Sequence, residues 1–187
     1  AMAHAYSPRA ITRAVQAGVR SIEHGNLLDA ATAQVMRQHG AFLVPTLVTY
    51  AALAAEGERL GWSADMLAKL AKVRAAGVDS LRTARAAGVP VAFGTDLLGH
   101  MHAQQNHEFR LRLEAMSPVE VLQSATIVAA RLLNADDRLG QLKPGALADL
   151  LVVDGDPTVG LDMLVDPQAG IRLVMQGGRT VRSSLAG

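Results

Sequence analysis

The stretch Val89-Pro90-Val91-Ala92-Phe93-Gly94-Thr95-Asp96 is a short apolar segment followed by the carboxylate of Asp96. Two other apolar segments in the chain are likewise followed by a polar side chain, in both cases a histidine. Residues 1–3 precede His4, and residues 19–22 lead toward His24. Each segment has the length and composition of a buried strand. In a (β/α)8 barrel the catalytic groups come from the C-terminal ends of several strands, so they are distant in sequence and close in space. The three polar residues therefore predict a divalent-metal site.

Helix signals alternate with these strands. Ser7-Pro8 combines a cap residue with the proline that suits the first helical position, and Asp29 caps a second helix. Ser63 begins a long amphipathic helix that ends near Gly88. Residues 41–45 supply a further strand. Strands that alternate with helices of this length indicate βαβ units and an α/β fold with a parallel sheet.

Two segments between these elements leave alternatives open. Residues 46–61 are too polar for a core and too apolar for a plain linker, so they form either a lid over the barrel rim or a longer packed connection. After Asp96, the sequence His100-x-His102 puts both imidazoles on one side only if the segment is extended. We therefore predict that His100, His102 and Asn106 belong to a substrate-contacting or solvated loop rather than to the metal site.

Composition limits the classes of partner. The 187 residues suit one domain or one domain with an appendage, and the interior must consist mainly of Ala, Val and Leu because only 3% of residues are aromatic. A net charge of +1, with both signs interspersed, predicts neither a nucleic-acid nor a membrane partner. The chain has no cysteine, which fits a reducing compartment and leads us to expect a cytoplasmic protein.

The tail changes character after residue 137. Residues 138–157 contain a Gly/Pro turn, a buried strand and an acidic turn, and residues 171–181 have the pattern of a hairpin around Gly177-Gly178. We therefore divide the chain into an α/β domain over residues 1–137 and part of a small β domain over residues 138–187.

Four motifs resemble, in the family's own order, those of the metal-dependent amidohydrolase superfamily. These are His4-Ala5-Tyr6 (strand five), Glu23-His24-Gly25 (strand six), Gly94-Thr95-Asp96 (strand eight) and the tail segment 140–157. The resemblance is to the branch of imidazolonepropionase-like proteins and Xaa-Pro dipeptidase-type prolidases. It implies the C-terminal half of a TIM (β/α)8 barrel, strands five to eight, followed by part of a small β-sandwich domain.

The resemblance also implies roles for individual residues. His4, His24 and Asp96 would be ligands of a divalent metal, most often zinc, and Asp96 would also accept a proton from the attacking water. Tyr6 would polarise the scissile carbonyl, since two residues along a strand return its side chain to the face of His4. Zinc accepts such nitrogen and oxygen donors and lowers the pKa of bound water toward about 7. The implied activity is hydrolysis of an amide or peptide bond in a small substrate such as a dipeptide or an N-acyl amino acid.

The sequence departs from complete members of the superfamily. It lacks their His-x-His motif on strand one and their strand-four lysine, because the only lysines are Lys69, Lys72 and Lys143. We therefore expect a fragment of a longer protein that is inactive alone. Its two sheet edges can recruit partners, so a homo-oligomer is a further expectation. A superfamily deaminase or cyclic amidohydrolase is one alternative function, and a non-catalytic binding or assembly module is another.

Overall fold

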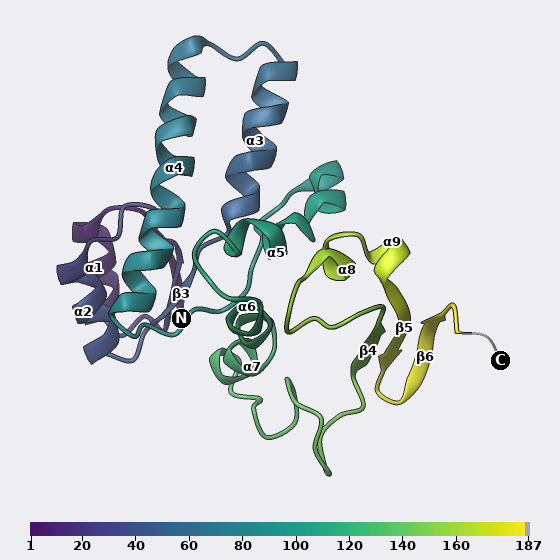
Figure 1. Ribbon diagram of the computed structural model, residues 1–187. Helices are drawn as coiled ribbons and strands as arrows, with labels where there is room; N and C mark the ends of the chain where they lie inside the picture. Colours follow the sequence, from purple (N-terminus) through teal and green to yellow (C-terminus); the bar gives the residue numbers. More distant parts are fainter. Residues whose placement is uncertain (186–187) are drawn as a thin grey trace.

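The computed structural model describes residues 1–185 and has a mixed α/β fold with two separate three-stranded sheets (Figure 1). The first sheet contains β1 (Met2–Ala5), β2 (Ser21–His24) and β3 (Phe42–Val44) in the order β1-β2-β3. Both pairs of strands are parallel, with Ala5 opposite His24 and Glu23 opposite Val44. The parallel sheet predicted from the alternating pattern is therefore present.

The fourth predicted strand, at residues 89–93, is reduced to a single parallel bridge between Leu43 and Val91. The Leu43 N–H donates to the Pro90 carbonyl (3.0 Å), and the Ala92 N–H donates to the Leu43 carbonyl (2.9 Å). Proline has no N–H to add to the ladder. The segment nevertheless lies next to β3, which places Asp96 at the same end of the sheet as the other strand ends.

The helices begin where the sequence places their caps. Ser7 and Asp29 accept hydrogen bonds from backbone N–H groups in the first turns of α1 and α2, and Ser117 forms a complete capping box on α6. The helices that surround the first sheet are α1 (Pro8–Gln16), α2 (Ala30–Gln38), α3 (Leu47–Arg59), α4 (Ala64–Ala86), α5 (His107–Arg112), α6 (Pro118–Ala125) and α7 (Ile127–Leu132), with a 3-10 helix, η1 (Gly99–Gln104), after Asp96. None of the helices within residues 1–185 has both the length and the hydropathy needed to cross a membrane.

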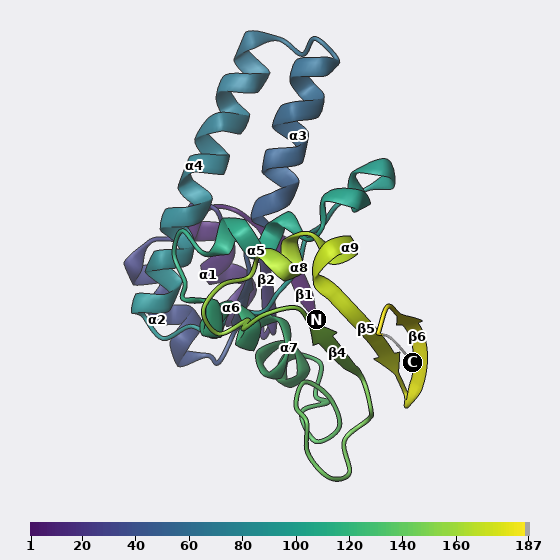
Figure 2. The ribbon, with the colours of Figure 1, turned by 45° about the vertical axis from the view of Figure 1, so that its right-hand side comes forward.

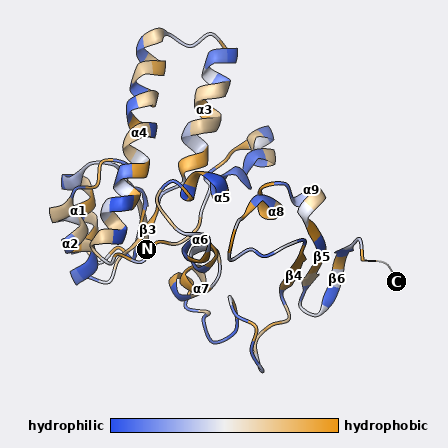
Figure 3. Ribbon diagram, viewed as in Figure 1, coloured by the Kyte–Doolittle hydropathy of each residue, from blue (hydrophilic) through white to orange (hydrophobic). Residues whose placement is uncertain are grey.

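Helices α3 and α4 form a hairpin that extends away from the sheet (Figures 1 and 2). Residues 47–59, for which the sequence left a lid or a longer connection open, are therefore a helix. Gly57 makes room for the Trp62 ring, which lies in the connection between the two helices, since a Cβ at this position would lie 2.5 Å from that ring. The base of α3 is buried and hydrophobic (Figure 3), and this base is what reaches the strand ends.

The second sheet is antiparallel and contains β4 (Leu150–Val153), β5 (Ile171–Gln176) and β6 (Arg179–Ser183). The predicted hairpin is present, with Gly177 and Gly178 both at positive φ in its turn. The Asp149 carboxylate accepts a hydrogen bond from the Gly177 N–H. Two short helices, α8 (Asp162–Val165) and α9 (Pro167–Gly170), connect β4 to β5.

A buried ion pair on α5 joins the helices to the end of the sheet. Glu108 and Arg112 are both fully buried, with 2.7 Å between Arg112 Nε and Glu108 Oε1. Glu108 Oε2 also accepts a hydrogen bond from the Val48 N–H in the first turn of α3. The remaining guanidinium donors reach Ser124 Oγ and the Ala92 carbonyl. Because every partner belongs to a different element, this network fixes the positions of α3, α6 and the 89–93 segment relative to α5.

The network predicts a large stability difference between two arginines on the same helix. Arg112→Leu leaves the Glu108 carboxylate buried without its cation, so we expect a loss of about 3–5 kcal/mol in the free energy of unfolding. Arg110→Leu is the control, because the Arg110–Asp162 pair is exposed and contributes less than about 1 kcal/mol. Urea denaturation measures both values, and similar losses for the two variants would contradict the assignment.

Candidate functional site

The structure brings His4, His24 and Asp96 together at the C-terminal end of the parallel strands. His4 lies on β1, His24 is the last residue of β2, and Asp96 follows the 89–93 segment. His4 Nδ1 lies 2.8 Å from His24 Nε2, and Asp96 Oδ2 lies 3.8 Å from the same His24 nitrogen. Side chains separated by up to 92 positions in the sequence therefore converge on one atom of His24.

The backbone turns sharply at three neighbouring strand ends. His24 (φ 75°), Thr46 (φ 46°) and Asp96 (φ 50°) all have left-handed conformations, and each lies at or just beyond the end of a strand segment. This conformation costs non-glycine residues of order 1–3 kcal/mol each and is concentrated at functional sites. The clustering indicates that the direction of these side chains is maintained at a cost in stability.

Burial and a contact with Thr46 determine which nitrogen of the His24 imidazole is available as a ligand. The residue is 3% exposed, and burial lowers its pKa, with the Asp96 carboxylate acting in the opposite direction. His24 Nδ1 lies 2.8 Å from Thr46 Oγ1. A neutral imidazole whose Nδ1–H donates to Thr46 has its Nε2 lone pair directed at His4 and Asp96. A second hydrogen bond of this kind is how metal-binding histidines are usually oriented.

The donor set fits zinc, while the contact between the imidazoles is that of a hydrogen bond. Two nitrogen atoms bound to one zinc ion at about 2.0–2.1 Å are separated by about 3.3 Å in tetrahedral geometry. His4 Nδ1 and His24 Nε2 are closer than this, at 2.8 Å. Residues 1–185 contain no group of three or more acidic or histidine side chains already spaced for a metal ion. One imidazole would have to move outward by about half an ångström for the two nitrogen atoms to reach the separation of zinc ligands.

Two tyrosines contact the His24 ring from different directions. Tyr6 stacks on it, with 4.9 Å between ring centroids and an interplanar angle of 11°, and remains 42% exposed. Tyr50, in the first turns of α3, presents a perpendicular ring at 6.0 Å and is 6% exposed. Burial, reinforced by the neighbouring Tyr6, raises the pKa of Tyr50. Tyr50 was not among the site residues predicted from the sequence, because it lies in a segment with no strand pattern and no recognised motif.

The other predicted site residues contact different parts of the chain. Because η1 is a 3-10 helix, the segment containing His100 and His102 is not extended. His100 Nε2 lies 3.0 Å from Glu56 Oε1 on α3, and the Asn106 amide donates to the Leu164 carbonyl. His102 is exposed. The substrate-binding role of these three residues stays a prediction.

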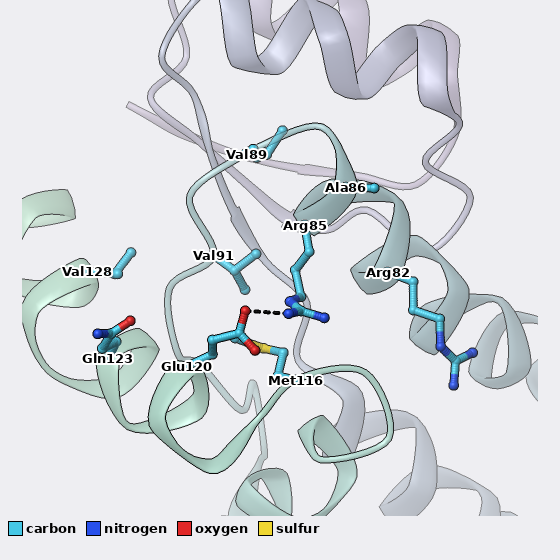
Figure 4. A pocket seen from close by; sticks show the side chains of 10 residues that line it. Arg82, Arg85, Ala86, Val89, Val91, Met116, Glu120, Gln123 and Val128 are labelled. Atoms are coloured by element: carbon cyan, nitrogen blue, oxygen red, sulfur yellow. Dashed lines mark hydrogen bonds and ion pairs between the residues drawn. The ribbon is translucent and has the colours of Figure 1, made fainter. Parts of the chain in front are cut away.

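A cavity of about 430 Å3 lies elsewhere, between α4, the 89–91 segment and α6 (Figure 4). Its rim carries the Arg85–Glu120 ion pair, and its wall includes Val89 and Val91. These valines begin the segment that ends at Asp96, so the cavity opens at the opposite end of the strand. It is therefore separate from the site around His24.

Comparison with known proteins gives matches along nearly the whole chain. A solved amidohydrolase is 51% identical with a TM-score of 0.93, over 99% of this chain and 45% of that protein. A prolidase solved in complex with N-methylphosphonate-L-proline is 50% identical with a TM-score of 0.92, over 98% and 45%. The ochratoxinase of Aspergillus niger is 28% identical over 179 residues, which are 95% of this chain and 37% of that relative. The chain thus spans less than half the length of each relative.

The sequence model of the Amidohydrolase family matches residues 1–181, a range that contains the three converging side chains and both tyrosines. Together with the two relatives of about 50% identity, this match agrees with the order of motifs in the sequence. The chain therefore belongs to the amidohydrolase family of hydrolases.

Proposed function

We propose that this chain is the metal-binding portion of a hydrolase that cleaves the C–N bond of a dipeptide or N-acyl amino acid. The observation that carries the proposal is the convergence of His4 and Asp96 on His24 Nε2. We place the chain in the C-terminal half of a TIM barrel. Three parallel strands, a fourth bridged segment and matches to about 45% of the length of solved relatives support that placement.

Each site residue has a distinct chemical role in this proposal. The two imidazoles and the Asp96 carboxylate would hold a divalent ion, which we propose to be zinc and which supplies Lewis acidity when bound. The Asp96 side chain is 46% exposed, so water and substrate can reach it. Asp96 accepts the proton of the attacking water and transfers it to the departing amine. The Tyr6 hydroxyl hydrogen-bonds to the scissile carbonyl.

The substrate class follows from the relatives with the highest identity given above. The prolidase at 50% identity was solved in complex with N-methylphosphonate-L-proline. The proposed substrate is accordingly a small amide whose leaving group is an amino acid, and proline dipeptides are the first compounds to test.

Zinc titration tests the metal site directly. We expect one zinc ion per chain, and His24→Ala should weaken binding by more than about 100-fold because it removes the central ligand. His39→Ala is the matched control, since the His39 ring is exposed and bonds to the Val35 carbonyl at the end of α2. Isothermal titration calorimetry measures both affinities. Unchanged binding in His24→Ala, or equal losses in the two variants, would contradict the site.

Activity is testable by joining this chain to the preceding part of the prolidase relative in one polypeptide. We expect this fusion to hydrolyse proline dipeptides and Asp96→Asn to lower kcat by about 10²–10⁴, because the proton acceptor is lost. Amine release measures the rate, with His39→Ala again as the control. A folded, zinc-loaded fusion that releases no amine from any dipeptide would rule out the proposed reaction.

The unpaired side of β1 supports a second proposal, that the isolated chain pairs with another copy. Within residues 1–185, β1 is hydrogen-bonded to a strand only on the side of β2. Light scattering after size-exclusion chromatography should give twice the 19.6 kDa chain mass, because exposed sheet edges recruit strands. Replacement of Met2 by proline should shift the mass toward the monomer, because the backbone of Met2 faces the unpaired side of β1. A wild-type monomer at high concentration would exclude this assembly.

A further inference from the structure

The Tyr50 hydroxyl is a buried polar group without a hydrogen-bond partner among residues 1–185. Tyr50 itself is 6% exposed. Leaving a buried hydroxyl unpaired costs free energy, so such groups are rare unless they have a use. The Tyr6 phenol and the Thr46 hydroxyl are its polar neighbours, but neither meets the geometry of a hydrogen bond to the Tyr50 oxygen. The unpaired hydroxyl therefore lies among the residues of the candidate site.

Three hydrogen bonds fix the turn of α3 from which Tyr50 projects. Thr46 Oγ1 lies 2.8 Å from His24 Nδ1, and the Val48 N–H donates to the buried Glu108 carboxylate (2.7 Å). Thr49 Oγ1 donates to the backbone carbonyl of Asp96 (3.0 Å). Tyr50 is thus held by residues that also position two of the proposed metal ligands.

The Tyr6 and Tyr50 hydroxyls differ in their exposure to water. Tyr6 is 42% exposed, so water competes for its hydroxyl, whereas the Tyr50 hydroxyl is buried. A fixed donor in a water-excluded site stabilises a developing negative charge more strongly than an exposed one. A carbonyl oxygen has two lone pairs and can accept from both phenols at once.

We infer that Tyr50 is a further catalytic residue, which donates a hydrogen bond, alongside Tyr6, to the substrate amide oxygen as it becomes an oxyanion. This inference rests on the proposed function and identifies the group that stabilises its transition state. When water adds to the carbonyl carbon, the C=O π electrons move onto the oxygen. Both phenols keep their protons, and the charge is neutralised when the C–N bond breaks and the carbonyl re-forms.

A stability comparison separates this role from a structural one. Tyr50→Phe keeps the ring against His24 and removes only the unpaired hydroxyl, so the Tm of the chain should rise by about 2–4 °C. Ser80→Ala is the matched control, because the Ser80 hydroxyl is also buried but donates to the Gly25 carbonyl (2.6 Å). Its removal should lower the Tm. A lower Tm in Tyr50→Phe as well would show that the hydroxyl is structural and overturn the inference.

A binding comparison tests the oxyanion role on the zinc-loaded chain. Tyr6 and Tyr50 are the only tyrosines, so incorporation of fluorotyrosine gives two 19F resonances, assigned with the Tyr6→Phe and Tyr50→Phe variants. N-methylphosphonate-L-proline, a tetrahedral anionic probe, should shift both resonances. Tyr50→Phe should weaken its binding by roughly 10- to 100-fold and that of planar N-acetyl-L-proline by less than about threefold.

The outcomes distinguish this inference from the proposed function. If the wild-type chain binds the phosphonate and Tyr50→Phe binds it equally well, the oxyanion role is wrong and the hydrolase proposal stands. Equal weakening of both probes would likewise overturn the oxyanion role. If the zinc-loaded wild type binds neither probe, the proposed function itself fails, and the inference fails with it.

Discussion

Parallel pairing of short strands is the constraint on which the site depends. Since β1, β2 and β3 run in the same direction, their C-terminal residues lie at one edge of the sheet, and the Leu43–Val91 bridge brings the segment before Asp96 to that edge. Left-handed backbone at His24 and Asp96 then turns the chain away as soon as the strands end. The cost of these conformations is offset by the surrounding pairing and packing.

The helices contribute the rigidity that the short strands lack. The Glu108–Arg112 pair joins the start of α3 to the Ala92 carbonyl, so the helix that carries Tyr50 and the segment that leads to Asp96 share one buried anchor. Such a pair is expensive to desolvate and contributes more to fixing one arrangement than to net stability. The arrangement fixed in this chain includes the unpaired Tyr50 hydroxyl and the left-handed backbone at the strand ends. Both features lower stability, as expected where function is favoured over stability.

Local signals in the sequence were sufficient for much of the fold. Ser7, Asp29 and Ser63 identified helix starts because caps act through the adjacent backbone, and the Gly177-Gly178 turn identified the hairpin. The convergence of His4, His24 and Asp96 was predicted from strand ends and the family motifs, whereas their role as metal ligands stays a prediction. Helix α3 and Tyr50 were not predicted, because the position of Tyr50 depends on long-range contacts. Its ring lies against His24, 26 residues away, and the Val48 N–H in the same helix donates to Glu108, 60 residues away. The shortening of the fourth strand to a single bridge was also not predicted, because it depends on pairing with Leu43, which is distant in the sequence.

The structure of the zinc-loaded chain, determined by crystallography with anomalous scattering at the zinc edge, tests the metal site most directly. We expect one zinc ion with His4 Nδ1, His24 Nε2 and Asp96 Oδ2 at about 2.0–2.2 Å. The His24 Nδ1–Thr46 contact should be preserved, and the two imidazole nitrogens should be farther apart than their present 2.8 Å. A zinc ion bound elsewhere, for example at His100 or His102, with the His4–His24 contact unchanged, would contradict the proposed metal site.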